Sequence, residues 1–180
     1  MKKQMKKQMK KQITVLCVLI CMCFFCIGCG NTSADTEVTE TSELISMLND
    51  DIPAIQDLEV SAMDAYNSYF AEDTTIDKDA FLTDLNDNII PEYEEFMTAL
   101  SELSYETARV QECYQMYYAS MESQHQALLK VRQALTEEDE DYQSEAYEYL
   151  ETAKTEYESY KEYVSQVASE NNITINIVTE

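Results

Sequence analysis

Glycine most restricts the possible folds of this 180-residue chain, because it is almost absent. Its two copies are Gly28 and Gly30, so everything after residue 30 is free of glycine. Tight β-hairpin turns and phosphate-binding loops both depend on glycine, for positive φ angles or for close backbone approach. The sequence therefore argues against a hairpin-rich β fold, a phosphate-cradling loop and a dinucleotide fingerprint.

Apolar residues recur at three- and four-residue spacing in four segments, the pattern of amphipathic helices. The first helix is predicted to begin near Asn49–Asp51, with Pro53 in its first turn, and Ser42–Leu48 can form a preceding helical turn. The second is predicted to start near Asp77–Asp79, and Pro91 should push Ile90 out of helical geometry and produce a kink or restart. The predicted core face of the first helix is Ile55, Leu58, Ala62, Tyr66 and Tyr69.

The third helix is predicted to run from near Ser104 to Leu135 or Thr136. The fourth should end at Glu170, where Asn171 and Asn172 can supply a left-handed cap. Its coiled-coil-like seam is Ala146, Leu150, Ala153, Tyr157, Tyr160, Val164 and Val167. Amphipathic helices joined by short loops predict an all-α fold, an elongated antiparallel up-and-down bundle of about four helices.

The N-terminus has the parts of a secretory signal. Twelve residues with six lysines precede an apolar run from Ile13 to Ile27, which ends at Gly28. This run is shorter than the ~20 apolar residues that a spanning helix needs. The basic flank remains on the cytoplasmic side, so the rest of the chain is expected outside.

Cys26-Ile27-Gly28-Cys29 resembles a bacterial lipobox, and Gly30 after it is similar to lipoproteins of Gram-positive bacteria. The resemblance implies cleavage between Gly28 and Cys29 and covalent diacylglycerol, with a possible further N-acyl chain, on Cys29. Two acyl chains anchor stably where one would not. The alternative is an uncleaved N-terminal anchor helix.

The lipobox interpretation divides the chain into four predicted parts. Residues 1–28 are the predicted cleaved signal peptide, and residues 29–48 carry the lipidated cysteine and a flexible acidic tether. Residues 49–172 are the bundle domain, and residues 173–180 are a short extended tail. The tail alternates isoleucine with polar residues, and we expect it to pack along the bundle rather than present a free strand edge.

The net charge limits the kinds of partner that this protein can bind. All 35 acidic residues lie after Cys29, but only six of the 12 basic residues do, so that part carries a net charge of −29 against −23 for the whole chain. Such a surface repels nucleic acids and anionic membranes. We therefore expect no nucleic-acid partner.

Few residues are available for chemistry. Cys113 becomes the only thiol once the signal peptide has left with its four cysteines and Cys29 is acylated, and it is expected to be a buried small hydrophobe. Glu122 and His125 match the Glu-x-x-His element of di-iron bundles, but those sites use two such elements and this chain has one histidine. No catalytic residues, metal site or cofactor are therefore predicted. Weak candidates for calcium are Glu137, Glu138, Asp139, Glu140 and Asp141, which are more easily read as a solvated loop.

The chain has 13 tyrosines and no tryptophan. Tyrosine combines a flat apolar ring with a polar tip, which suits interfaces. Seam tyrosines such as Tyr157 and Tyr160 should pack in the core. Tyr147, Tyr149 and Tyr163 fall off the strict seam and are the candidates for an exposed binding surface.

As a whole, the tether, the four predicted helices and the tail resemble the small helical lipoproteins of Firmicutes, including their cell-wall-binding type. The resemblance transfers no site residues. The anchor, the tether, the tyrosine-rich helices and the absence of a catalytic constellation lead us to expect a non-enzymatic protein of the cell membrane, lipid-anchored on the extracytoplasmic face, that binds an envelope protein or cell-wall component. The alternative is a lipoprotein that binds calcium or a small ligand through its acid-rich loops.

Overall fold

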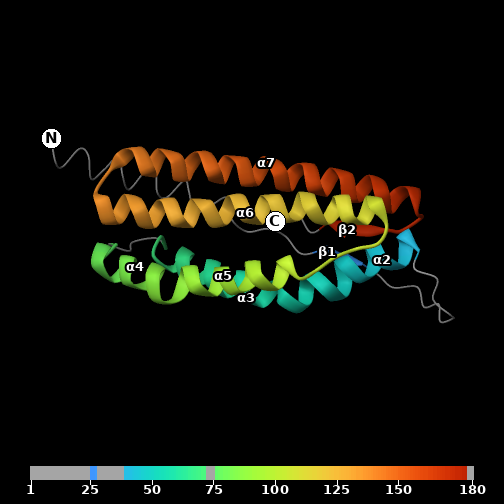
Figure 1. Ribbon diagram of the computed structural model, residues 1–180, viewed down its shortest axis with the longest axis horizontal. Coiled ribbons are helices and arrows are strands. Elements are labelled where there is room, and N and C mark those ends of the chain that lie inside the picture. The colour runs from blue at the N-terminus through green and yellow to red at the C-terminus, as the bar shows by residue number, and fades with distance from the viewer. Residues whose placement is uncertain (1–24, 28–38, 72–75, 178–180) are drawn as a thin grey trace.

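The computed structural model describes residues 25–27, 39–71 and 76–177. Within these ranges the chain forms an all-α bundle of four antiparallel helical runs, which confirms the predicted fold class (Figure 1). Gly28, Cys29 and the tether up to residue 38 lie outside the described residues, as does most of the predicted signal peptide.

The first helical run consists of α2 (Glu40–Ser46), the π-helical segment η1 (Met47–Asp51) and α3 (Ile52–Ser68). Its N-terminus is a capping box. The Thr39 hydroxyl accepts a hydrogen bond from the Ser42 N–H at 3.1 Å, and the Ser42 hydroxyl accepts one from the Thr39 N–H at 3.0 Å. This pairing satisfies two backbone donors that a helix start would leave open.

The prediction that this helix begins at Asn49–Asp51 is wrong, because the run starts at Glu40 and those residues lie inside η1. The early turns are helical because they have an apolar face of their own, formed by Leu44, Met47 and Leu48. The predicted core face is also rotated. Ala62 and Tyr66 are buried, whereas Ile55, Leu58 and Tyr69 are partly buried at its border.

The second run consists of α4 (Lys78–Asp84), η2 (Leu85–Ile89) and α5 (Ile90–Ser101). It starts where the sequence predicts. The Asp77 carboxylate caps it by accepting hydrogen bonds from the N–H groups of the second and third helical residues at 3.1 and 3.2 Å.

Both π-helical segments precede an Ile-Pro pair. Pro53 and Pro91 lie in the first turns of α3 and α5, each directly after such a segment. Proline lacks an N–H, and its ring clashes with the carbonyl four residues earlier. A π-turn widens the helix at that point, so the chain stays helical. The expected restart at Pro91 takes this form, but the prediction that Ile90 leaves helical geometry is wrong, since its φ and ψ are −68° and −46°.

The other two runs are single long helices, α6 (Ala108–Glu137) and α7 (Glu140–Glu170). At 1.5 Å per residue each is about 45 Å long. The third helix begins later than the predicted Ser104, and the fourth ends at the predicted Glu170. Asn172 has φ 58°, which confirms the predicted left-handed cap.

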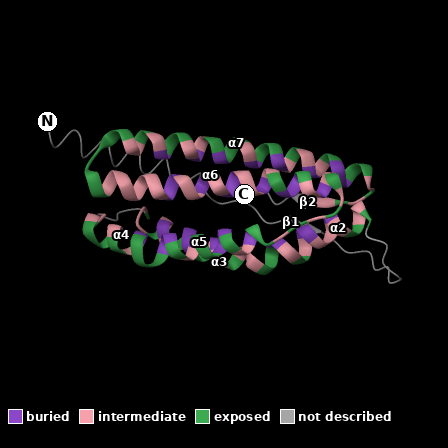
Figure 2. Ribbon diagram, viewed as in Figure 1, coloured by how far each residue is buried: buried purple, intermediate pink, exposed green. Residues whose placement is uncertain are grey.

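The helices form two layers, with the α6–α7 hairpin packed over the pair made by α3 and α5 (Figure 1). Buried residues line the facing sides of the layers, and exposed residues line the outer sides (Figure 2). All seven predicted seam residues of α7 are buried.

The described chain also has two three-residue strands, β1 (Phe25–Ile27) and β2 (Ile175–Ile177). They pair antiparallel, with Ile27 opposite Ile175. Ile173 and Ile175 pack against the core, which confirms that the tail follows the bundle. β1 belongs to the segment that the sequence predicts to be cleaved.

No helix in the described part of the chain is both long and apolar enough to cross a membrane.

The core predicts where substitutions will be costly. Phe96 of α5 is fully buried and packs edge-on against Tyr93, with ring centroids 5.5 Å apart. Phe96→Ala should lower the free energy of unfolding by about 3–5 kcal/mol, because it leaves a cavity in a closed core. Glu95→Ala, at the exposed neighbouring position, should change it by less than about 0.5 kcal/mol. Equal urea midpoints for the two variants would contradict this packing.

Candidate functional site

An acidic side chain lies in the core. Glu59 is 4% exposed and is the only buried acid among the described residues. Ile52 and Tyr66, both buried, lie seven residues to either side of it on α3, about two helical turns away. The helix periodicity therefore places the Glu59 side chain on the core face, and its position in the helix is enough to explain its burial.

Tyr93 of α5 connects this region to α6. Its hydroxyl lies 3.1 Å from the Met121 carbonyl oxygen and 3.0 Å from Gln124 Oε1, so one proton is shared by two acceptors. Gln124 is buried as well, and its Nε2 has no hydrogen-bond partner in the described structure. The middle of the bundle therefore contains a polar cluster with an unused donor.

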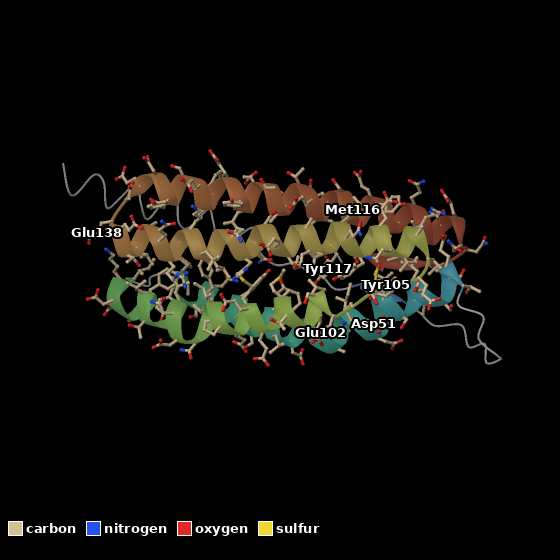
Figure 3. The ribbon with its side chains drawn as sticks, in the orientation of Figure 1. Asp51, Glu102, Tyr105, Met116, Tyr117 and Glu138 are labelled. Atoms are coloured by element: carbon tan, nitrogen blue, oxygen red, sulfur yellow. The ribbon has the colours of Figure 1, made fainter. Side chains whose placement is uncertain are left out.

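Tyr117 of α6 completes the cluster. It points into the space between the layers (Figure 3), and its ring lies 5.2 Å from that of Tyr160 and 6.5 Å from that of Tyr157, both on α7. We define the buried polar cluster as Glu59, Tyr93, Tyr117 and Gln124. It takes side chains from three helices.

The electrostatics of the cluster follow from burial. Loss of solvation raises the pKa of Glu59 from its ordinary 4.5 to about 7. Burial also raises the pKa of Tyr93 and of Tyr117 well above the usual value, and repulsion from Glu59 raises both further. The cluster can therefore hold or release one proton near neutral pH, inside the protein.

The Glu-x-x-His element does not form a ligand pair. Glu122 accepts a hydrogen bond from Gln126 Nε2 at 2.8 Å. His125 stacks on Tyr93, with the rings 13° from parallel, and its Nε2 lies 3.7 Å from a Glu94 carboxylate oxygen. No group of three or more His, Cys, Asp or Glu residues in the described chain could hold a metal ion.

The acid run Glu137–Asp141 forms the exposed turn between α6 and α7. Glu138 has a left-handed backbone, and its carboxylate is 2.7 Å from Lys78 Nζ on α4, which lowers its pKa (Figure 3). Asp139 caps α7 by accepting from the Asp141 N–H at 2.9 Å. Glu137 accepts a hydrogen bond from Gln133 Nε2 at 3.1 Å, so three of the candidate calcium ligands already have structural partners.

The candidate surface tyrosines have different environments. Tyr147 is 41% exposed, the one large hydrophobic side chain that is exposed in the described chain. Tyr149 is half-buried against the core, and the Tyr163 hydroxyl donates to Glu112 of α6. Tyr157 and Tyr160 are buried, as predicted for the seam. Of the three candidate surface tyrosines, Tyr147 alone is exposed.

Cys113 is fully buried, which confirms the prediction. Burial raises the pKa of its thiol to about 12. The reactive thiolate is therefore scarce at neutral pH.

A second polar network joins the helices at one end of the bundle. The Glu43 carboxylate of α2 accepts hydrogen bonds from the Thr107 N–H at 2.8 Å, from the Thr107 hydroxyl and from the Glu106 N–H. It therefore caps the start of α6 from another helix. Arg109 reinforces this end by pairing with Glu40 and Glu170.

Sequence reasoning missed Glu59. A signal was present, because Glu59 occupies the position between Ile52 and Tyr66 where the helical pattern requires a core residue. The predicted core face names its neighbour Leu58 instead, which is only partly buried.

Comparison of the chain with protein-family models, curated proteins and solved structures gives no match.

Glu43 yields a stability prediction with a defined pH window. Its burial alone would raise its pKa, but the hydrogen bonds from Thr107 and Glu106 more than offset this and leave the pKa below 4.5. The stability that it contributes is present above pH 4.5 and is lost as the pH falls through the lowered value. Glu43→Gln should cost about 1 kcal/mol at neutral pH and less in acid, measured by urea unfolding.

Glu158→Gln is the matched control, since Glu158 is exposed in the middle of α7. It should leave the neutral-pH midpoint unchanged. An equal effect of both substitutions would show that Glu43 does not act as a cap.

Proposed function

We propose that this protein is a lipid-anchored binding protein of the extracytoplasmic membrane face, with diacylglycerol on Cys29, and that it has no enzymatic activity. The lipobox-like residues Cys26 to Cys29 support the anchor. The bundle resembles the small helical lipoproteins of Firmicutes in its helix number and its proline-interrupted second helix. The helical surface would bind a partner held in the same envelope.

The outer face of α7 carries the argument for binding. Tyr147 is exposed on this helix, and most charged side chains on the same solvent-facing surface are acidic. Tyrosine gains contact area at low entropic cost, and aromatic residues are enriched at interfaces. The exposed acids of the helix are Glu140, Asp141, Glu148, Glu158, Glu162 and Glu170.

This chemistry favours a basic protein as the partner. A surface with net charge −29 attracts cations at long range, and the open ring of Tyr147 offers a contact at short range. Anionic wall polymers would be repelled unless a cation bridged them. Calcium capture by the turn at Glu137–Asp141 gains no support from the structure, because Gln133, Lys78 and the start of α7 already bind three of its carboxylates.

Mass spectrometry of the membrane-extracted protein tests the anchor. The N-terminal residue should be Cys29 carrying diacylglycerol. Cys29→Ser should abolish both the added mass and the processing, because the thiol is the acceptor. A wild-type chain that still begins at Met1 and lacks lipid would refute the anchor.

Crosslinking in intact envelopes tests the binding surface. The double variant Tyr147→Ala with Glu148→Lys should lose most of the crosslinked product, and raised salt should weaken the wild-type signal because surface charges are screened. Glu95→Lys, with the same charge change on exposed α5, should retain it. Equal losses in both variants would point to net charge alone and overturn the role of Tyr147.

A further inference from the structure

The proposed binding surface makes no use of the buried polar cluster. Glu59 lies between the layers, away from the outer face of α7, and the residue is 4% exposed. None of the ion pairs between described side chains includes it. An unpaired carboxylate inside a helical core is costly, so its presence calls for an explanation.

Among the described residues, the ionisable groups whose pKa Glu59 raises are tyrosines and not cations. Tyr93 faces it from α5 and Tyr117 from α6, and Glu122 of α6 adds negative potential at Tyr93. His125 stacks on Tyr93, and its Nε2 lies 3.7 Å from a Glu94 carboxylate oxygen. Lys161 of α7 sits over the Tyr157 ring, 5.3 Å from its centroid, at the edge of the cluster. On its own helix the nearest buried ionisable side chain is Tyr66, and from α7 Tyr157 and Tyr160 lie behind Tyr117.

We propose that Glu59 is a proton-operated lock between the two layers of the bundle. With the carboxyl protonated, the cluster is neutral and the layers pack closely. With the carboxyl ionised, the layers separate locally at α3 so that water can reach the charge. The juxtaposition of Glu59, Tyr93, Tyr117 and Gln124 in the closed core supports this assignment.

The geometry explains why ionisation opens the core. Tyr93 already shares its proton between Met121 and Gln124, so it cannot donate to Glu59 without losing those acceptors. The buried Nε2 of Gln124 is an unused donor, but one neutral amide does not replace the hydration of a full charge. The π-turn at η1, directly before α3, is the point where the first helical run would deform to let α3 move.

The sign of the effect follows from linkage. The pKa of Glu59 is raised in the folded state, so its contribution to stability is complete below pH 4.5 and is lost as the pH rises through about 7. Local opening should therefore increase towards alkaline pH. The contribution of Glu43 to stability has the opposite pH dependence, because it is lost as the pH falls below 4.5. The two effects therefore occur in different pH ranges and can be measured separately.

Hydrogen exchange on the full chain in detergent tests the lock. Protection factors of the α3 amides should fall roughly 50-fold between about pH 5 and about pH 8, after correction for intrinsic exchange rates. Glu59→Gln keeps the shape but removes the charge, so its protection factors should be nearly independent of pH. Glu95→Gln, at an exposed site of α5, should behave as the wild type.

A wild-type pH response that persists in Glu59→Gln would overturn the proposal, and so would a wild-type chain with no response. If Glu59→Gln does not fold, ¹³C-carboxyl NMR of the labelled wild type decides. A glutamate that titrates near pH 7 supports the lock, whereas titration of every carboxyl below about pH 5.5 refutes it.

Discussion

The packing of the α6–α7 hairpin supports the rest of the bundle. Neither helix can bury its apolar stripe alone, and the packed region between them includes the contacting rings of Tyr117, Tyr157 and Tyr160. Tyrosine fills much volume but leaves a hydroxyl that must find an acceptor or water. The use of tyrosine instead of phenylalanine or leucine therefore makes the interior partly polar. That polarity makes a buried glutamate tolerable when it is protonated.

The two Ile-Pro pairs determine how the layer formed by α3 and α5 packs against this hairpin. A regular α-helix that reached Pro53 or Pro91 would break or kink sharply. The preceding π-turn instead changes the helical phase, so that the apolar residues on both sides of the proline face one core. Leu44 before η1, Met47 at its start and Tyr66 in α3 are all buried with this arrangement. The same phase change puts Glu59 inside.

The sequence predicts α7 in detail because its seam repeats without proline and ends at a recognisable cap. It predicts the second run less well, since proline penalties are local and do not reveal that a π-turn can absorb them. The start at Glu40 was missed because Thr39 and Ser42 lie in a polar stretch that reads as a tether. Glu59 was missed for a related reason: hydrophobic periodicity counts an acid as solvent-facing, and only tertiary packing shows otherwise. The caps contributed across helices, such as Glu43 on α6, cannot be deduced from local sequence at all.

The surface charge and the buried acid act on stability in the same direction but in different pH ranges. Net charge of −29 after Cys29 makes the compact state repel itself, and this repulsion grows as exposed carboxylates ionise near pH 4. It is spread over the whole surface and is weakened by salt. Glu59 ionises near neutral pH at one point in the core, where ions in solution do not screen it. A loss of stability that develops around pH 7 and persists at high salt would therefore originate in the core, and one that develops near pH 4 and disappears with salt would originate at the surface.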